Sequence, residues 1–173
     1  MGSYYYLVAS LPDLHAGEKM PISYPEFLKL CEGNVSKEEY ELLRTLNLEK
    51  PGNRASKKWA EFYGVLSMEL IMRRSELLGK PFLKEFDRDE DIAALAASAL
   101  SAKNPLEAEL FLLEKEFENL DDIVGDHYFD GIYLFVYAIK LRLLERRSCF
   151  DKEKGREEFR RIMDTVSERV YGI

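Results

Sequence analysis

The two histidines, His15 and His127, are the first residues in this chain that could support metal chemistry. Neither lies in an HxxxH or ExxH motif, the spacings that place two metal ligands on one face of a helix. Asp126, His127 and Asp130 come closest to a ligand set, but the same residues are typical of a solvated turn, which we favour. We therefore predict no metal ion and no cofactor.

Side chains that could act as acids, bases or nucleophiles are present but are not arranged in a recognisable motif. Glu107, Glu114 and Glu118 fall on the outer face of an expected helix, whereas general acid–base chemistry needs a carboxylate in an apolar pocket. The chain contains no GxSxG, Walker or GxGxxG motif, and its serines have no local histidine partner. These observations predict that the protein is not an enzyme.

Two kinds of residue are candidates for binding a partner. The aromatic cluster near the N-terminus is suited either to core packing or to a protein interface. Two arginine pairs either compensate the negative ends of helices or receive an anion or an acidic partner. The candidate partner-binding residues are Tyr4, Tyr5, Tyr6, Leu7, Arg73, Arg74, Arg146 and Arg147.

The composition restricts the classes of partner. The chain has 173 residues, of which 46% are hydrophobic and 33% charged, and a formal net charge of −7. This acidic balance argues against nucleic acid and against simple docking on anionic lipid, which both need a basic face. Cys31 and Cys149 are far apart and are expected to be reduced, half-buried thiols of a cytosolic protein. No signal peptide or membrane-spanning segment is recognisable.

The element that must organise the chain is the stretch from Asp130 to Arg147. Ile132 to Ile139 form an unbroken apolar run, which is much shorter than the roughly 20 residues that span a bilayer. A helix that is apolar on nearly every side belongs in a core, with other helices around it. We therefore predict a central, buried helix over these residues.

Start and stop signals place the other helices around it. Ser23 and Ser36 each begin a capping box, and Asn104-Pro105 marks a third helix start. We also expect a long helix over 54–78, an alanine-rich helix over 89–102, and a last helix capped by Asp151. The last helix carries an apolar stripe of Phe159, Ile162, Met163, Val166 and Val170. Residues 4–8 have strand propensity but no second strand to pair with, so a buried helical or extended arm is favoured.

The predicted fold is therefore all-α, a bundle of about six to seven helices in a single domain over residues 1–173. The sequence FYGV at 62–65 resembles FDGI at 129–132, and each opens an apolar helix that ends in Arg-Arg-Ser. Either the chain contains two degenerate repeats, over residues 1–82 and 89–173, or two core helices with basic ends look alike by composition.

The opening YYYLVASLPDL, residues 4–14, resembles the signature of an uncharacterised bacterial family encoded with V-type ATPases. That family is distantly similar to the C subunit (d in eukaryotes) of V/A-type ATPases, an all-helical protein that connects the membrane rotor ring to the central shaft. Residues 59–79 resemble the family's helix that ends in an arginine and Leu-Gly. Residues 104–146 resemble the repeat of the C subunit.

This resemblance implies a non-catalytic helical adaptor that links the rotor ring to the central stalk and serves ion transport. Its partners would be other V-type ATPase subunits, and it would be cytoplasmic, either free or held on the cytoplasmic face of the membrane through the complex. The alternative hypothesis is a stand-alone helical protein–protein interaction module. A third hypothesis is an enzyme of a type that the sequence does not reveal. It would require a deep pocket with a polar lining.

Overall fold

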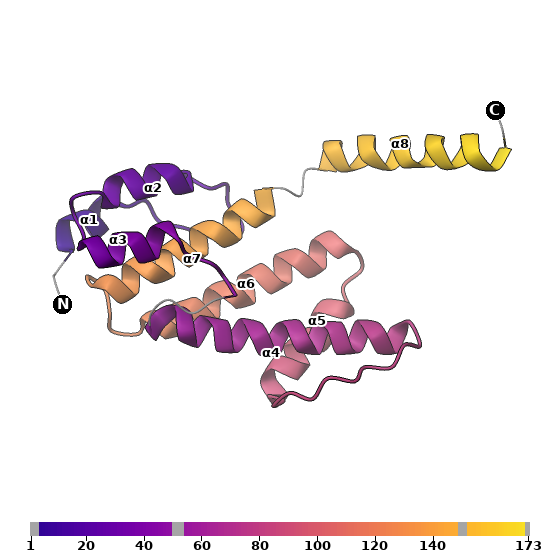
Figure 1. Cartoon of the computed structure of the whole chain (residues 1–173), viewed down its shortest axis with the longest axis horizontal. Helices are drawn as coiled ribbons and strands as arrows, with labels where there is room; N and C mark the ends of the chain where they lie inside the picture. Colours follow the sequence, from indigo (N-terminus) through magenta and orange to yellow (C-terminus); the bar gives the residue numbers. More distant parts are fainter. Residues whose placement is uncertain (1–3, 50–53, 149–151, 172–173) are drawn as a thin grey trace.

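The computed structural model describes residues 4–49, 54–148 and 152–171 (Figure 1). Within these ranges the chain forms eight helices and no strand, which confirms the predicted all-α class and slightly exceeds the predicted number of helices. The helices are α1 (Tyr5–Ser10), α2 (Tyr24–Cys31), α3 (Lys37–Arg44), α4 (Arg54–Leu77), α5 (Glu90–Leu100), α6 (Pro105–Val124), α7 (Gly131–Ser148) and α8 (Lys152–Tyr171).

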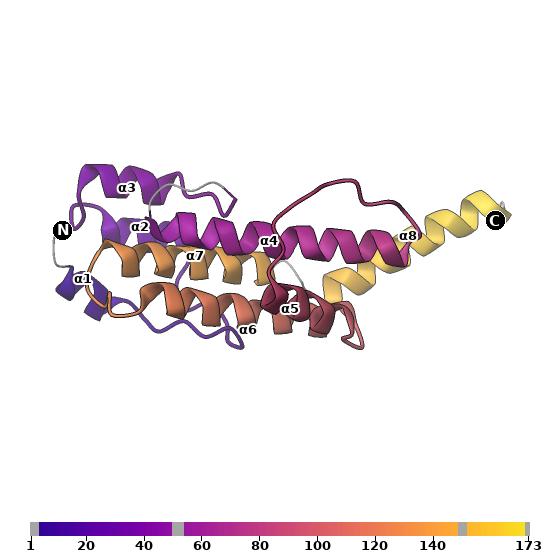
Figure 2. The ribbon, with the colours of Figure 1, turned by 90° about the horizontal axis from the view of Figure 1, so that it is seen from below.

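Helix α7 is the centre of the bundle, as the sequence predicts. Ten of its residues are buried, including Phe135 and Ile139, and it contacts α2, α3, α4 and α6. Figure 2 shows α4, α7 and α6 running side by side, with α1, α2 and α3 gathered around one end of α7. Burying apolar side chains on every face of one helix requires neighbours on every face, and these helices supply them.

Local capping explains where several helices begin. The backbone N–H of Glu26 donates to the hydroxyl of Ser23, the carboxylate of Glu26 accepts from the backbone of Ser23, and the two bonds form the predicted capping box. The hydroxyl of Ser36 likewise caps α3, and the side chain of Asn104 accepts from the backbone N–H of Glu107, 2.9 Å away, at the start of α6.

The aromatic N-terminus forms a short helix, not a strand. Leu7 and Val8 of α1 are buried in the core around α7, and Tyr4 is packed against its edge. The strand propensity of these residues is overridden because no other described segment offers a strand edge, whereas the helix packs Leu7 and Val8 into the core. Of the two arms considered from the sequence this is the helical one, but it is only partly buried, because Tyr5 and Tyr6 are exposed.

A second, smaller apolar cluster joins α4, α5 and α6. Leu66 and Leu112 pack there with Ala96 and Ala99, which are almost completely buried. Small side chains allow α5 to approach α4 closely, as the alanine-rich sequence indicates. The two helices of the proposed repeat, α4 and α7, also contact each other, and the division into repeats stays a prediction.

Helix α8 lies apart from the bundle and projects beyond the end of α7 (Figures 1 and 2). Its predicted stripe is exposed, since Phe159, Ile162, Met163 and Val166 have 47–66% of their surface accessible. The side chain of Val170 and the predicted cap, Asp151, fall outside the described residues. None of the described helices is both long enough and apolar enough to cross a bilayer.

Cys31 is a free thiol that is completely buried, not half-buried as predicted, and Cys149 lies outside the described residues. Burial raises the pKa of the Cys31 thiol to about 12. At pH 8 only about one thiol in 10⁴ would then be ionised, and the thiolate is the reactive form. In a Cys149→Ser variant we expect Ellman's reagent to label Cys31 only after denaturant is added. Rapid labelling of the native protein would contradict the buried position.

Candidate interaction surface

Three aromatic rings meet at one end of the bundle and form what we call the aromatic end, defined as Tyr5, Tyr6 and Phe129. The ring centroids of Tyr5 and Phe129 are 4.8 Å apart, and those of Tyr5 and Tyr6 are 5.6 Å apart. Tyr6 is 88% exposed, Tyr5 53% and Phe129 43%. Aromatic side chains that pack together yet stay in contact with water are typical of protein interfaces.

The aromatic end is held by the core beneath it. The backbone N–H of Tyr4 donates to the carbonyl of Phe129 across 2.9 Å, which fixes α1 to the turn between α6 and α7. The hydroxyl of Tyr4 bonds to the carboxylate of Glu39 on α3, and burial together with this carboxylate raises the pKa of Tyr4. Leu7 is buried and therefore anchors the surface from below, whereas Tyr5 and Tyr6 are its accessible members.

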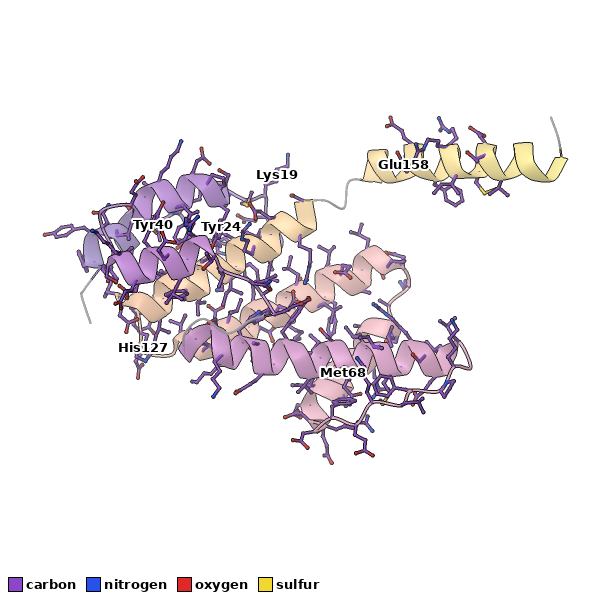
Figure 3. The ribbon with its side chains drawn as sticks, in the orientation of Figure 1. Lys19, Tyr24, Tyr40, Met68, His127 and Glu158 are labelled. Carbon is purple, nitrogen blue, oxygen red and sulfur yellow. The ribbon has the colours of Figure 1, made fainter. Side chains whose placement is uncertain are left out.

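The turn that carries Phe129 also carries His127, labelled in Figure 3. Nδ1 of His127 lies 2.6 Å from one carboxylate oxygen of Asp130, and the other oxygen accepts from the backbone N–H of Ile132 at the start of α7. Asp130 therefore caps the central helix. Among the residues with described placement, no three His, Cys, Asp or Glu side chains are grouped closely enough to hold a metal ion.

The arginine pair of α4 is divided between two roles. The guanidinium of Arg73 donates to the carbonyl of Ala93 on α5 and lies 3.5 Å from the carboxylate of Glu69. Arg74 is exposed, and no hydrogen bond or ion pair joins its guanidinium to another described residue. Arg73 thus ties α4 to α5, and Arg74 is the member of this pair that is accessible to a partner.

The arginine pair of α7 is used within the protein. Nη2 of Arg146 lies 2.7 Å from the carboxylate of Glu116 on α6. The guanidinium of Arg147 donates to the backbone carbonyls of Ala16, Gly17 and Glu18 at 2.6–3.1 Å. Arg147 therefore fastens the loop that follows α1 to the end of α7, in addition to compensating the helix dipole.

We expect Arg147→Ala to lower the free energy of unfolding by about 1–3 kcal/mol, because three carbonyls lose a charged donor. Amide hydrogen exchange over residues 13–22 should accelerate. Arg74→Ala is the matched control and should change the stability by less than about 0.5 kcal/mol. Equal effects of the two substitutions in urea denaturation would refute the distinction between them.

Two buried carboxylates, Glu69 and Glu116, were not singled out by the sequence reading. Glu69 is completely buried and binds Arg88 through two contacts of 2.6 and 3.1 Å, and Glu116 is 2% exposed. The sequence contains a signal for both, because each glutamate occupies a position on the apolar face of its helix. Glu69 follows Leu66 by three residues, and Glu116 precedes Leu120 by four. Each has an arginine partner, which indicates a structural ion pair.

A cavity of about 420 Å³ lies between the loop after α1 and helices α6 and α7. Asp13, His15, Asp121, Tyr133 and Lys140 supply polar groups to its wall. Nζ of Lys140 lies 2.6 Å from a carboxylate oxygen of Asp121, so these two opposite charges satisfy each other. The cavity has a polar lining, but its lysine is already paired and it offers no set of metal ligands among the described side chains.

Comparison with known proteins gives a family but no function. A family model described as "Protein of unknown function (DUF2764)" matches residues 84–170, just over half of the chain. The match covers part of the linker before α5, then α5, α6, α7 and α8 up to residue 170, and it excludes the tyrosine-rich opening. No curated protein and no solved structure matches. The protein is therefore a member of this family, whose function is not known.

Proposed function

We propose that the protein is a non-catalytic helical adaptor of a V-type ATPase, similar in role to the C subunit that links the membrane rotor ring to the central stalk. The observation that carries the proposal is the aromatic end. Two of its three rings, Tyr5 and Tyr6, belong to the opening stretch, Tyr4 to Leu14, that resembles the signature of a family encoded with these ATPases. It leaves Tyr5 and Tyr6 accessible on a helix that Leu7 and Val8 anchor in the core.

The arrangement of the helices is consistent with an adaptor. The aromatic end and α8 lie at opposite ends of the molecule, so each could engage a different protein (Figure 1). Exposed apolar groups of this kind usually mark interaction sites. The partners we propose are the subunits of the rotor ring and the central stalk, which would hold the protein on the cytoplasmic face of the membrane without inserting it.

Affinity purification from the native cell tests this proposal. We expect the tagged protein to recover other V-type ATPase subunits, and Tyr6→Ser to reduce that recovery several-fold with little change in thermal stability, because Tyr6 is almost fully exposed. Leu83→Ser is a matched control, since Leu83 is equally exposed, at 88%, but lies in the linker between α4 and α5. It should leave recovery unchanged.

The outcome separates the two hypotheses of function. Recovery of the tagged protein without any ATPase subunit above background would count against the adaptor and favour the stand-alone interaction module. Tyr24→Ser serves as a further check, because Tyr24, labelled in Figure 3, is buried and its hydroxyl donates to the carbonyl of Leu43. Tyr24→Ser should lower the stability of the protein. The amount of ATPase subunits recovered with it should fall only because less of the protein is folded.

A further inference from the structure

Helix α8 and the bundle each present an apolar surface that the other described parts of the chain leave uncovered. On α8 this is the stripe of Phe159, Ile162, Met163 and Val166, with spacings of three, one and three residues that keep the side chains on one face. Figure 3 shows α8, with Glu158 labelled, well away from the bundle. A 20-residue helix with an exposed apolar face gains its stability by packing against something.

On the bundle, the matching surface is a groove between α4 and α6 near the C-terminal end of α7. It encloses about 330 Å³, and its apolar lining is formed by Leu66, Leu70, Ile71 and Leu112, beside the ion pair of Glu116 with Arg146. Ile71 is 49% exposed although it is a large aliphatic residue. The groove is therefore suited to an apolar helix face.

The charges along the two surfaces are complementary. Arg74 stands on the α4 wall of the groove and Glu109 on the α6 wall. On α8, Glu158 and Arg160 flank Phe159 on opposite sides, because successive residues of a helix are separated by about 100°. One orientation of α8 thus brings Glu158 to the side of Arg74 and Arg160 to the side of Glu109. Such pairs set orientation more than they add affinity.

We propose that two copies of this chain form a symmetric dimer in which each α8 docks in the α4–α6 groove of the other copy. A helix the length of α8 is about 30 Å long and about 10 Å wide, so one docked helix covers on the order of 300 Å² of each surface. Two reciprocal dockings bury on the order of 1,200 Å², the lower limit for a stable interface, whereas a single docking buries about half of that.

Reciprocal exchange also fits the position of α8 in the chain. Helix α8 follows the bundle directly and is displaced from it in the structure, as an exchanged element must be (Figures 1 and 2). Exchanging a terminal helix uses surfaces that each copy already has, and a two-fold axis closes the assembly without leaving a free groove. The dimer is independent of the proposed role in an ATPase, because it concerns the purified protein alone.

The test is the mass of the full-length protein, measured by light scattering during size-exclusion chromatography over a range of concentrations. We expect the wild type to have twice the 20.1 kDa of the chain. Ile162→Glu on α8 and Ile71→Glu in the groove should each reduce the mass to one chain. Arg161→Glu places a glutamate on the residue before Ile162, on the opposite face of α8, and should leave the dimer intact. Circular dichroism would verify that all three variants remain helical.

Mixing the two disruptive variants tests whether α8 of one copy docks in the groove of the other copy. The Ile162→Glu chain has an intact groove and the Ile71→Glu chain an intact α8, so their mixture should recover part of the dimer at high concentration. A wild-type mass of one chain at every concentration would overturn the proposal and indicate docking within the chain or on another protein. A dimer broken by Ile162→Glu but not by Ile71→Glu would also overturn it, and would indicate pairing of α8 with α8.

Discussion

Phe135→Ala should lower the free energy of unfolding by roughly 3–5 kcal/mol, the range found when a large aromatic side chain is removed from a core. Phe135 is 2% exposed and belongs to the main apolar cluster around α7. Because α7 touches four other helices, the space left by the ring is bounded on all sides and cannot close easily. Urea denaturation followed by circular dichroism measures the effect.

Phe129→Ala is the control, since it removes the same atoms from a ring that is 43% exposed at the aromatic end. Less apolar surface returns to water there, so we expect less than about half the loss seen for Phe135→Ala. If both variants unfold at the same urea concentration as the wild type, α7 is not the centre of a packed core.

Arg146→Met should also be strongly destabilising, by about 3–5 kcal/mol, because it leaves the buried carboxylate of Glu116 without a counter-charge. The side chain of Glu116 is 3% exposed and lies 2.7 Å from Nη2 of Arg146. Arg161→Met is the matched control. Arg161 is also 2.7 Å from a carboxylate, that of Glu158, but these side chains are 75% and 59% exposed, so the loss should stay below about 1 kcal/mol.

The effect of Arg146→Met should depend on pH. Burial raises the pKa of the Glu116 carboxyl above its ordinary value of 4.5, and the guanidinium of Arg146 opposes this rise. A carboxyl with a raised pKa binds its proton more tightly in the folded state, so its ionisation destabilises the protein as the pH rises from 4.5 through the raised value. Removing Arg146 raises the pKa of Glu116 further, and the difference from wild type should be larger at pH 8 than at pH 4.5.

A second substitution identifies the uncompensated charge as the cause. Adding Glu116→Gln to Arg146→Met removes the buried charge and should restore part of the stability, mainly at pH 8. If the double variant is as unstable as Arg146→Met at every pH, lost packing of the arginine stem is responsible and not the carboxylate of Glu116.

The sequence alone determined the local features of this protein. The capping residues Ser23, Ser36 and Asn104 predicted the starts of α2, α3 and α6, because a cap acts on backbone groups only a few residues away. The unbroken apolar run in α7 predicted a central helix, because a helix without a polar face must be covered all round.

The tertiary structure decided which residues contact distant parts of the chain and which stay exposed. Arg74 and Arg147 look alike in the sequence, yet one is exposed and the other binds three carbonyls of a loop about 130 residues away. The stripe of α8 has the periodicity of a packed helix but faces solvent. The periodicity of a sequence predicts that one face of a helix is apolar. Whether that face is covered depends on where the other helices, or a second chain, are placed.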